Sequence, residues 1–125
     1  MKQEKILLVD DEQIILETMG DDLREAGFDV VEARNGLEGI RQFKSGSIDL
    51  VISDLMMDEM DGFEVLKEIK RISPNTPVII ITGYPSNKAA KQALMMGASD
   101  IIIKPSGMEQ IFQAIRRHIQ SSPSD

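Results

Sequence analysis

Five short runs of apolar residues recur along the chain. They cover Ile6–Val9, Phe28–Val31, Leu50–Ile52, Val78–Ile81 and Ile101–Ile103. Each run has about the length of a β-strand, and nearly all its residues are apolar, without the alternation of a half-exposed strand. Continuous apolar character is typical of strands that are covered on both faces. The pattern therefore predicts five strands inside a sheet with two buried faces.

The segments between the runs carry apolar residues at helical spacing. These residues are Ile15, Met19, Leu23 and Ala26; Leu37 and Ile40; Leu66 and Ile69; Ala90, Ala93 and Leu94; and Ile111, Ile115 and Ile119. Strands that alternate with helices favour a parallel sheet. We expect right-handed crossovers, with helices on both faces of the sheet. The predicted fold class is α/β, a doubly wound (βα)5 sheet.

Polar residues and glycines stand where these helices should begin and end. Asn35 with Glu38, and Asp61 with Glu64, have the spacing of a capping box at a helix N-terminus. Gly27, Gly46 and Gly97 follow the predicted first, second and fourth helices, where glycine commonly ends a helix. These boundaries agree with the division into strands and helices.

The size of the chain limits it to one domain. It has 125 residues, 42% of them hydrophobic, which is enough for one core but not for a second folded module. We assign residues 1–120 to the domain and residues 121–125 to a disordered tail. The absence of cysteine excludes disulfides, thiolate metal sites and a cysteine nucleophile.

Charge and hydropathy narrow the choice of partners. The net charge is -7, which disfavours direct binding of nucleic acid, since phosphates are recognised chiefly by Lys and Arg. Aromatic residues make up 4% of the chain, too few for a base-stacking surface. The first apolar run is too short for a signal segment or a membrane span. We expect a soluble cytoplasmic protein that binds neither nucleic acid nor membrane directly.

Polar residues directly follow four of the five apolar runs. Asp10-Asp11-Glu12 follows the first run, Ser53-Asp54 the third, Thr82-Gly83 the fourth and Lys104-Pro105 the fifth. The C-terminal ends of parallel strands share one edge of the sheet, and ligands bind beyond that edge. We therefore expect carboxylates, a hydroxyl and an ammonium group to converge there.

This combination suits phosphoryl transfer. Clustered carboxylates repel one another unless a hard cation such as Mg²⁺ neutralises them. Asp11 and Asp54 are the expected direct ligands, and Asp10 is an outer or water-mediated one. A carboxylate can also act as a nucleophile and form an aspartyl phosphate, for which Asp54 is best placed. Lys104 and the Thr82 hydroxyl can each bind a phosphoryl oxygen.

A plainer interpretation of the acidic residues stays open. Asp10, Asp11 or Glu12 can stabilise the first helix as N-caps or through the helix dipole. Taken singly, Thr82 and Lys104 are more often a turn hydroxyl and a solvated lysine. Only their joint placement with Asp54 at separate strand ends favours a site.

The candidate residues lie in four motifs, which are ILLVDDE, DLVISDLMMDEMDG, VIIITG and IIIKP, in that order. Over essentially the whole chain, these motifs resemble the receiver domain of two-component response regulators. The resemblance implies the flavodoxin-like strand order 2-1-3-4-5. It implies that a sensor histidine kinase or a phosphotransfer protein donates a phosphoryl group from a phosphohistidine to Asp54. The implied Mg²⁺ ligands are Asp10, Asp11, Asp54 and the Met56 backbone carbonyl, and Thr82 and Lys104 match the family's switch hydroxyl and lysine.

Three positions depart from the family pattern. The residue three before Lys104, usually Tyr or Phe, is Ile101, so the aromatic rotamer switch cannot operate as usual. Asp58 replaces the usual proline after the phosphoacceptor, and Ser106 replaces the aromatic residue after Lys-Pro. The sequence leaves open whether the Lys104–Pro105 bond is cis.

The resemblance implies a switch and not a conventional enzyme. Such a domain catalyses only its own phosphorylation and dephosphorylation, and signals to a downstream protein or a fused output domain. The face formed by the predicted fourth helix, fifth strand and fifth helix, around Met95 and Ile101, is a candidate surface for a weak or phosphorylation-dependent dimer.

Other functions stay open as alternatives. A degenerate receiver would bind partners without phosphorylation, which Ile101 favours slightly and the complete acidic, Thr and Lys positions oppose. An aspartate-nucleophile phosphatase would carry Asp-x-Asp after the first strand and a cap domain, whereas Asp10 and Asp11 are adjacent and 125 residues leave no room for a cap. A flavin carrier shares the fold, but no phosphate-binding Gly, Ser or Thr loop follows the first strand.

Overall fold

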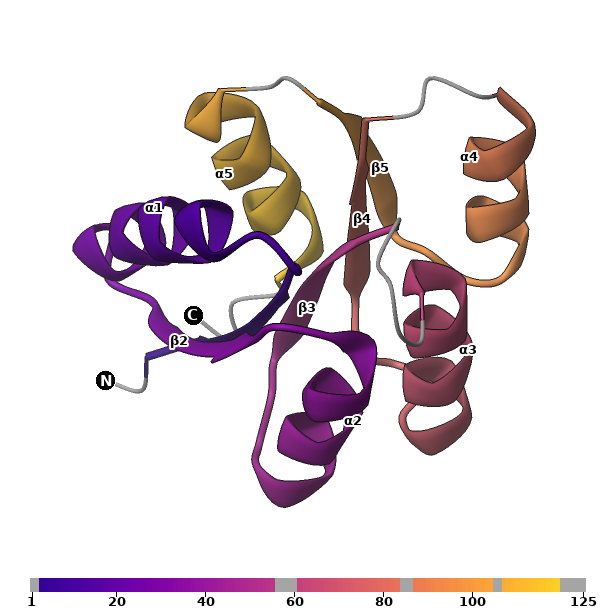
Figure 1. The fold of residues 1–125 in the computed structure, drawn as a ribbon, viewed down its shortest axis with the longest axis horizontal. Coiled ribbons are helices and arrows are strands. Elements are labelled where there is room, and N and C mark those ends of the chain that lie inside the picture. The colour runs from indigo at the N-terminus through magenta and orange to yellow at the C-terminus, as the bar shows by residue number, and fades with distance from the viewer. Residues whose placement is uncertain (1–2, 56–60, 84–86, 105–106, 120–125) are drawn as a thin grey trace, which may run out of the picture.

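Five parallel strands form one sheet at the centre of the computed structural model, with helices on both faces (Figure 1). The structure describes residues 3–55, 61–83, 87–104 and 107–119. The strands are β1 (Lys5–Val9), β2 (Asp29–Ala33), β3 (Leu50–Asp54), β4 (Val78–Thr82) and β5 (Asp100–Ile103). The helices are α1 (Gln13–Glu25), α2 (Gly36–Ser45), α3 (Gly62–Ile72), α4 (Asn87–Met95) and α5 (Met108–His118). This alternation confirms the predicted (βα)5 architecture.

The strand order across the sheet is β2-β1-β3-β4-β5, which confirms the order 2-1-3-4-5. Helices α1 and α5 cover one face of the sheet, and α2, α3 and α4 cover the other (Figure 1). The direction of winding reverses between β1 and β3, so the C-terminal ends of these strands border the crevice where such sheets bind ligands. None of the helices in the described ranges has the length and apolar character that a bilayer crossing requires.

Each strand contributes side chains to two separate cores. In β1, Leu7 and Val9 belong to the core under α2, α3 and α4, whereas Ile6 and Leu8 belong to the core under α1 and α5. Successive side chains of a strand point to opposite faces, so a strand covered on both needs an apolar residue at every position. Burying each such side chain contributes about 1.5–3 kcal/mol. Two-sided burial therefore explains the continuous apolar runs.

The buried side of some helices differs from the prediction. Leu37 and Leu94 belong to the apolar residues at helical spacing, yet they are 53% and 51% exposed. Ala26, assigned to the first helix, lies just beyond the end of α1 and is exposed. In α2 the buried residues are Gly36, Gly39, Ile40 and Phe43. The two glycines of this face have no side chain, so a pattern of large apolar residues does not detect them.

The predicted helix boundaries are confirmed with one change. Asp61 and Glu64 form the full capping box, with hydrogen bonds of 3.1 and 3.2 Å. At α2, Asn35 Oδ1 accepts from the Glu38 backbone N–H at 2.7 Å, but the Glu38 carboxylate accepts from the Arg34 N–H and not from Asn35. The second predicted capping box is therefore only half right. Gly27 and Gly97 follow α1 and α4 with φ of 103° and 107°, which only glycine adopts easily.

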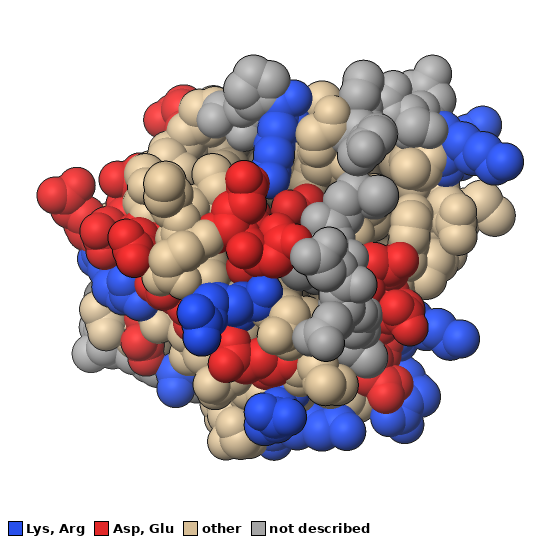
Figure 2. Space-filling view, viewed as in Figure 1, with Lys and Arg blue, Asp and Glu red and all other residues tan. Residues whose placement is uncertain are grey.

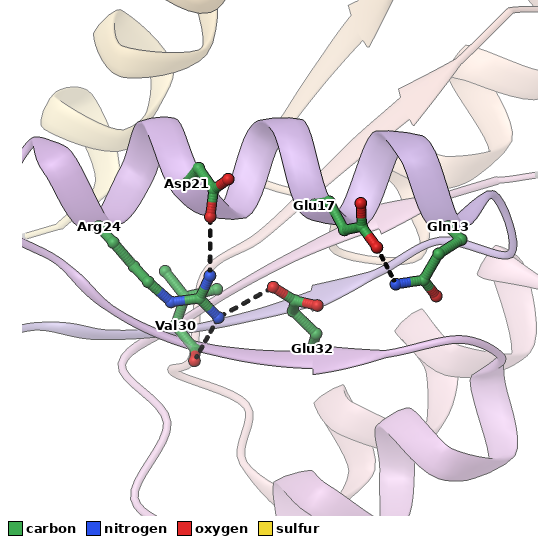
Figure 3. Close-up of polar contacts among 6 residues, drawn as sticks. All are labelled: Gln13, Glu17, Asp21, Arg24, Val30 and Glu32. Atoms are coloured by element: carbon green, nitrogen blue, oxygen red, sulfur yellow. Dashed lines mark hydrogen bonds and ion pairs between the residues drawn. The ribbon is translucent and has the colours of Figure 1, made fainter.

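A cluster of charged residues ties α1 to the edge strand β2 (Figure 3). Arg24 Nη2 donates to Glu32 Oε2 at 2.9 Å and to the Val30 carbonyl at 3.5 Å. Arg24 Nη1 lies 3.5 Å from Asp21 Oδ1 within the helix. Edge strands expose backbone groups that can pair with another chain. Arg24 therefore holds α1 against the sheet and donates a hydrogen bond to the Val30 carbonyl of the edge strand.

The N-terminal end of β5 is tied to the end of α5. Arg117 Nη2 donates to Asp100 Oδ2 at 2.5 Å, and His118 Nε2 lies 3.3 Å from the same oxygen. Burial raises the pKa of Asp100, but hydrogen bonds from Arg117 and the Ile101 backbone N–H outweigh burial and hold this pKa below its usual value. The ionised carboxylate therefore stabilises the folded state.

We expect Asp100→Asn to lower the free energy of unfolding by about 1 kcal/mol near neutral pH. Because folding lowers the pKa of Asp100, its contribution is complete above the pKa of the unfolded chain and is lost as the pH falls through the pKa of the folded chain. Urea unfolding should show the two proteins converging in acid. The control is Asp29→Asn, whose half-exposed carboxylate lies 3.9 Å from Lys5 Nζ. An equal, pH-independent loss in both variants would contradict this assignment.

Candidate functional site

Three strand ends bring the candidate residues to one edge of the sheet. Asp10 follows β1, Asp54 ends β3 and Lys104 follows β5. Their alignment is set by the sheet register, in which Val9 lies beside Ser53 and Asp54 beside Ile81. Figure 2 shows acidic side chains gathered near the centre of the face viewed in Figure 1. The predicted convergence of these residues is therefore present.

Asp10, Asp11 and Asp54 form a carboxylate cluster, in which one oxygen of each lies within 4.8 Å of the others. Asp10 and Asp54 are 4% and 7% exposed, whereas Asp11 is exposed. Burial raises the pKa of Asp10 above its ordinary value, although the Glu12 backbone N–H donates to its Oδ1 at 2.9 Å and opposes the shift. Two buried carboxylates beside an exposed one suit a hard cation that keeps some of its waters. The donor set therefore fits Mg²⁺.

Lys104 is the cation of this cluster. Its Nζ lies 3.2 Å from Asp54 Oδ2, 3.6 Å from Asp10 Oδ2 and 4.0 Å from Glu12 Oε1. Burial lowers the pKa of Lys104, but the carboxylates of Asp10 and Asp54 outweigh burial and raise this pKa above its usual value. The ammonium group therefore stays charged at neutral pH. It offsets only part of the negative charge of three carboxylates.

The contacts of Glu12 decide the capping alternative for that residue. Glu12 is the N-cap of α1, yet within the described ranges its side chain makes no capping hydrogen bond. Its carboxylate instead lies near Lys104. The capping interpretation is therefore wrong for Glu12, which the sequence had not assigned to the site. The only available signal was its place in the acidic run after β1.

Thr82 ends β4 and is 1% exposed. Its carbonyl oxygen accepts a hydrogen bond from the Lys104 backbone N–H at 2.7 Å, one residue beyond the pairing of Thr82 with Ile103. The residues predicted to bind phosphoryl oxygens are thus joined through the backbones of β4 and β5.

Several predictions fall outside the described residues. These concern the Met56 carbonyl ligand, Asp58, the Lys104–Pro105 bond, Ser106 and the tail at 121–125. Ile101, by contrast, is partly buried and packs against the core under α2, α3 and α4. The position of the family's usual aromatic residue is therefore filled by an aliphatic core contact.

Two residues beside Asp54 border the site, although the sequence did not assign them to it. Ser53 is buried, and its Oγ donates to the Asp54 carbonyl oxygen at 3.0 Å. Gly62 begins α3 and lies against the Asp54 backbone. Gly62 is the last residue of the motif DLVISDLMMDEMDG, eight positions after Asp54, where the spacing shows no contact between the two. Such a contact has no local sequence signal.

Comparison with known proteins agrees with these features. A sequence model described as the response regulator receiver domain matches residues 6–116. The chemotaxis protein CheY of Bacillus subtilis (strain 168) is 37% identical over 114 residues, which cover 90% of this chain and 95% of CheY. A crystal structure of a response regulator receiver domain protein from Clostridium thermocellum has a TM-score of 0.89 at 37% identity, with 93% of this chain and 94% of that chain covered.

Longer proteins contain a similar segment. The transcriptional regulatory protein GlrR of Escherichia coli (strain K12) is 40% identical over 121 residues, which are 97% of this chain but 27% of GlrR. The chain thus spans about a quarter of the length of this relative. The family match, the strand order and the acidic edge agree with one another. The chain belongs to the receiver domain family of two-component response regulators.

Proposed function

We propose that this domain is the phosphoacceptor switch of a phosphorelay, with Asp54 as the phosphoacceptor. The observation that carries the proposal is the position of Asp54 at the end of the central strand, with its Oδ2 3.2 Å from Lys104 Nζ and its carboxylate clustered with Asp10 and Asp11. The proposed donor is a phosphohistidine on a sensor histidine kinase or a phosphotransfer protein, which docks near α1.

The proposed cofactor is Mg²⁺, held by Asp10, Asp11, Asp54 and the Met56 backbone carbonyl. When bound, the ion supplies positive charge for the phosphoryl oxygens. Three carboxylates with a single ammonium leave the pocket negatively charged without it, and this repulsion favours a divalent cation. The exposed Asp11 would leave room for water ligands.

In the transfer step, Asp54 is the nucleophile. One of its carboxylate oxygens bonds to phosphorus while the phosphorus–nitrogen bond of the phosphohistidine breaks, and the electron pair of that bond returns to the imidazole. Lys104 binds one phosphoryl oxygen, and the Thr82 hydroxyl donates a hydrogen bond to another. Water later attacks the phosphorus, releasing inorganic phosphate and restoring the carboxylate. The domain changes only its own state and releases no organic product.

The signal passes from the phosphoryl group to the face formed by α4, β5 and α5. When Thr82 and Lys104 bind the phosphoryl oxygens, they bias a two-state rearrangement of the β4–α4 segment. The backbone bond from Lys104 to the Thr82 carbonyl keeps the two strand ends moving together. Ile101 has no aromatic ring to change rotamer, so the change reaches this face through backbone displacement and core packing.

The remaining proposals concern the setting of the domain. Residues 1–120 make up the receiver domain. The domain works in the cytoplasm and acts on a downstream protein or a fused output domain. With a net charge of -7, it leaves any contact with DNA to another chain or domain.

Asp54→Asn tests the phosphoacceptor, because the change is nearly isosteric and removes the nucleophile. Wild type should be phosphorylated by acetyl phosphate with Mg²⁺, and Mg²⁺ with beryllofluoride should stabilise it by about 2.7 kcal/mol at a hundredfold excess over Kd. The variant should show neither effect in phosphate-affinity gels or thermal unfolding.

Asp21→Asn is the matched control, since its carboxylate is 79% exposed and lies on α1 outside the carboxylate cluster. Equal phosphorylation of wild type and Asp54→Asn would refute the site. A wild type that binds neither reagent would support a degenerate scaffold, and steady hydrolysis of small phosphoesters would support a phosphatase.

Asp10→Asn tests the cost of the buried charge. Folding raises the pKa of Asp10, so the folded state binds the proton of this carboxyl group more tightly than the unfolded state does. The free energy of unfolding therefore falls as the pH rises from the pKa of Asp10 in the unfolded chain toward its pKa in the folded chain. The neutral side chain should therefore stabilise the metal-free protein by roughly 1 kcal/mol near neutral pH. Urea unfolding in EDTA measures the change.

Asp11→Asn is the comparison for this test, because Asp11 is exposed. It should leave metal-free stability nearly unchanged, yet both variants should lose the stabilisation that Mg²⁺ gives to wild type. A destabilised Asp10→Asn protein would contradict the assignment of an unfavourable buried charge.

Met95→Glu tests the proposed dimer face. Met95 is 82% exposed on α4 beside Leu94, and Ile103 of β5 is 39% exposed. Light scattering should show a rise in mass when Mg²⁺ and beryllofluoride are added to wild type, and no rise for Met95→Glu. Leu37→Glu, at an exposed leucine on α2, should behave like wild type. Equal association of both variants would exclude this face.

A further inference from the structure

Gly62 lies unusually close to the backbone of the proposed phosphoacceptor. It is buried at the first position of α3. A Cβ atom placed on it would lie 2.5 Å from the Asp54 carbonyl oxygen and 2.6 Å from Leu55 Cα. Both neighbours are backbone atoms, which cannot turn aside as the end of a side chain can. The start of α3 therefore rests directly on the strand end that carries Asp54.

Hydrogen bonds fix this contact from both sides. The Gly62 backbone N–H donates to the Leu55 carbonyl at 2.9 Å, and the Leu55 N–H donates to the Ile81 carbonyl of β4 at 2.9 Å. The Asp61–Glu64 capping box holds the first turn of α3 in place. Neither side of the contact can withdraw without breaking one of these interactions.

We propose that Gly62 is a positioning residue for the Asp54 carboxylate. Its missing side chain lets α3 and β3 meet closely enough to hold Asp54 in the cluster with Asp10, Asp11 and Lys104. This inference rests on the proposed role of Asp54. The position of the Asp54 carboxylate is then set by α3, a helix that contributes no reacting group to the pocket.

The size of the expected disturbance follows from the distances. To relieve the contact of an added methyl group from 2.5 Å to an ordinary 3.4 Å, α3 and the Asp54 carbonyl must move apart by about 0.9 Å. A misplacement of about 1 Å at a reacting group can cost up to a hundredfold in rate. Part of the movement will be taken up by α3, so we expect at least a tenfold loss of Asp54 reactivity.

The test compares Gly62→Ala with Gly20→Ala. Gly20 is also a buried helical glycine, but its added Cβ would meet Glu32 Oε2 at 2.7 Å, the end of a side chain on the α1–β2 side of the sheet (Figure 3). Two quantities are measured for each folded variant. One is the rate of phosphorylation by acetyl phosphate with Mg²⁺, and the other is the affinity for Mn²⁺ by electron paramagnetic resonance, with Asp54→Asn marking the affinity of a broken pocket.

For Gly62→Ala we expect a folded protein whose melting temperature lies below that of Gly20→Ala, because backbone and not a side-chain end must move. Its phosphorylation should be at least about tenfold slower than that of wild type, and its Mn²⁺ affinity should shift toward that of Asp54→Asn. Gly20→Ala should match wild type in both measurements. A folded Gly62→Ala protein with wild-type rate and affinity overturns the proposal, as does an equal loss in both variants.

Two further outcomes are separated by the same design. If Gly62→Ala is unfolded in buffer, both variants are measured in concentrated sucrose, which favours the compact state. A variant that remains unfolded there overturns the proposal, because Gly62 then serves the fold as a whole. If wild type binds Mn²⁺ but is not phosphorylated, the proposed function fails, and the Mn²⁺ comparison still decides whether Gly62 positions Asp54.

Discussion

The carboxylates of Asp10 and Asp54, held side by side at a buried edge of the sheet, are the constraint on which the rest of this structure depends. Buried like charges repel one another and lose hydration, so the arrangement is unfavourable unless a cation accompanies it. Lys104 supplies one such charge from β5, at 3.2 Å from Asp54 and 3.6 Å from Asp10. The ammonium neutralises only part of the negative charge of the pocket. The pocket therefore remains suited to a divalent cation and a phosphoryl group.

The fold keeps these charges in place through rigid neighbours. The strands β1 and β3 are buried on both faces, so neither can shift without opening a packed core. The ammonium comes from Lys104 at the end of the outer strand β5, and the backbone N–H of this residue donates to the Thr82 carbonyl of β4. The same framework that concentrates the negative charge therefore also couples it to the strand ends beside α4.

The strands and the charged residues at their ends could be predicted from the sequence. Apolar runs of strand length located all five strands, and the residues just after them identified the carboxylates, Thr82 and Lys104. The inference succeeded because a doubly covered parallel sheet imposes a strong local pattern and collects its strand ends at one edge. It failed where the determining contact was not local. Capping was the only separate role considered for Glu12, the helical spacing of Leu37 and Leu94 did not reveal that both are exposed, and Gly62 was not assigned to the site.

The sequence by itself therefore determined the fold class, the identity of the charged groups and their convergence at one edge, since each follows from the order of residues along a strand and its end. Only the tertiary structure decided how deeply each carboxylate is buried, which acids Lys104 approaches, and that α3 rests on the Asp54 backbone. Those features depend on distances between segments far apart in the chain. Such distances are set by the packing of whole elements, to which no short stretch of sequence corresponds.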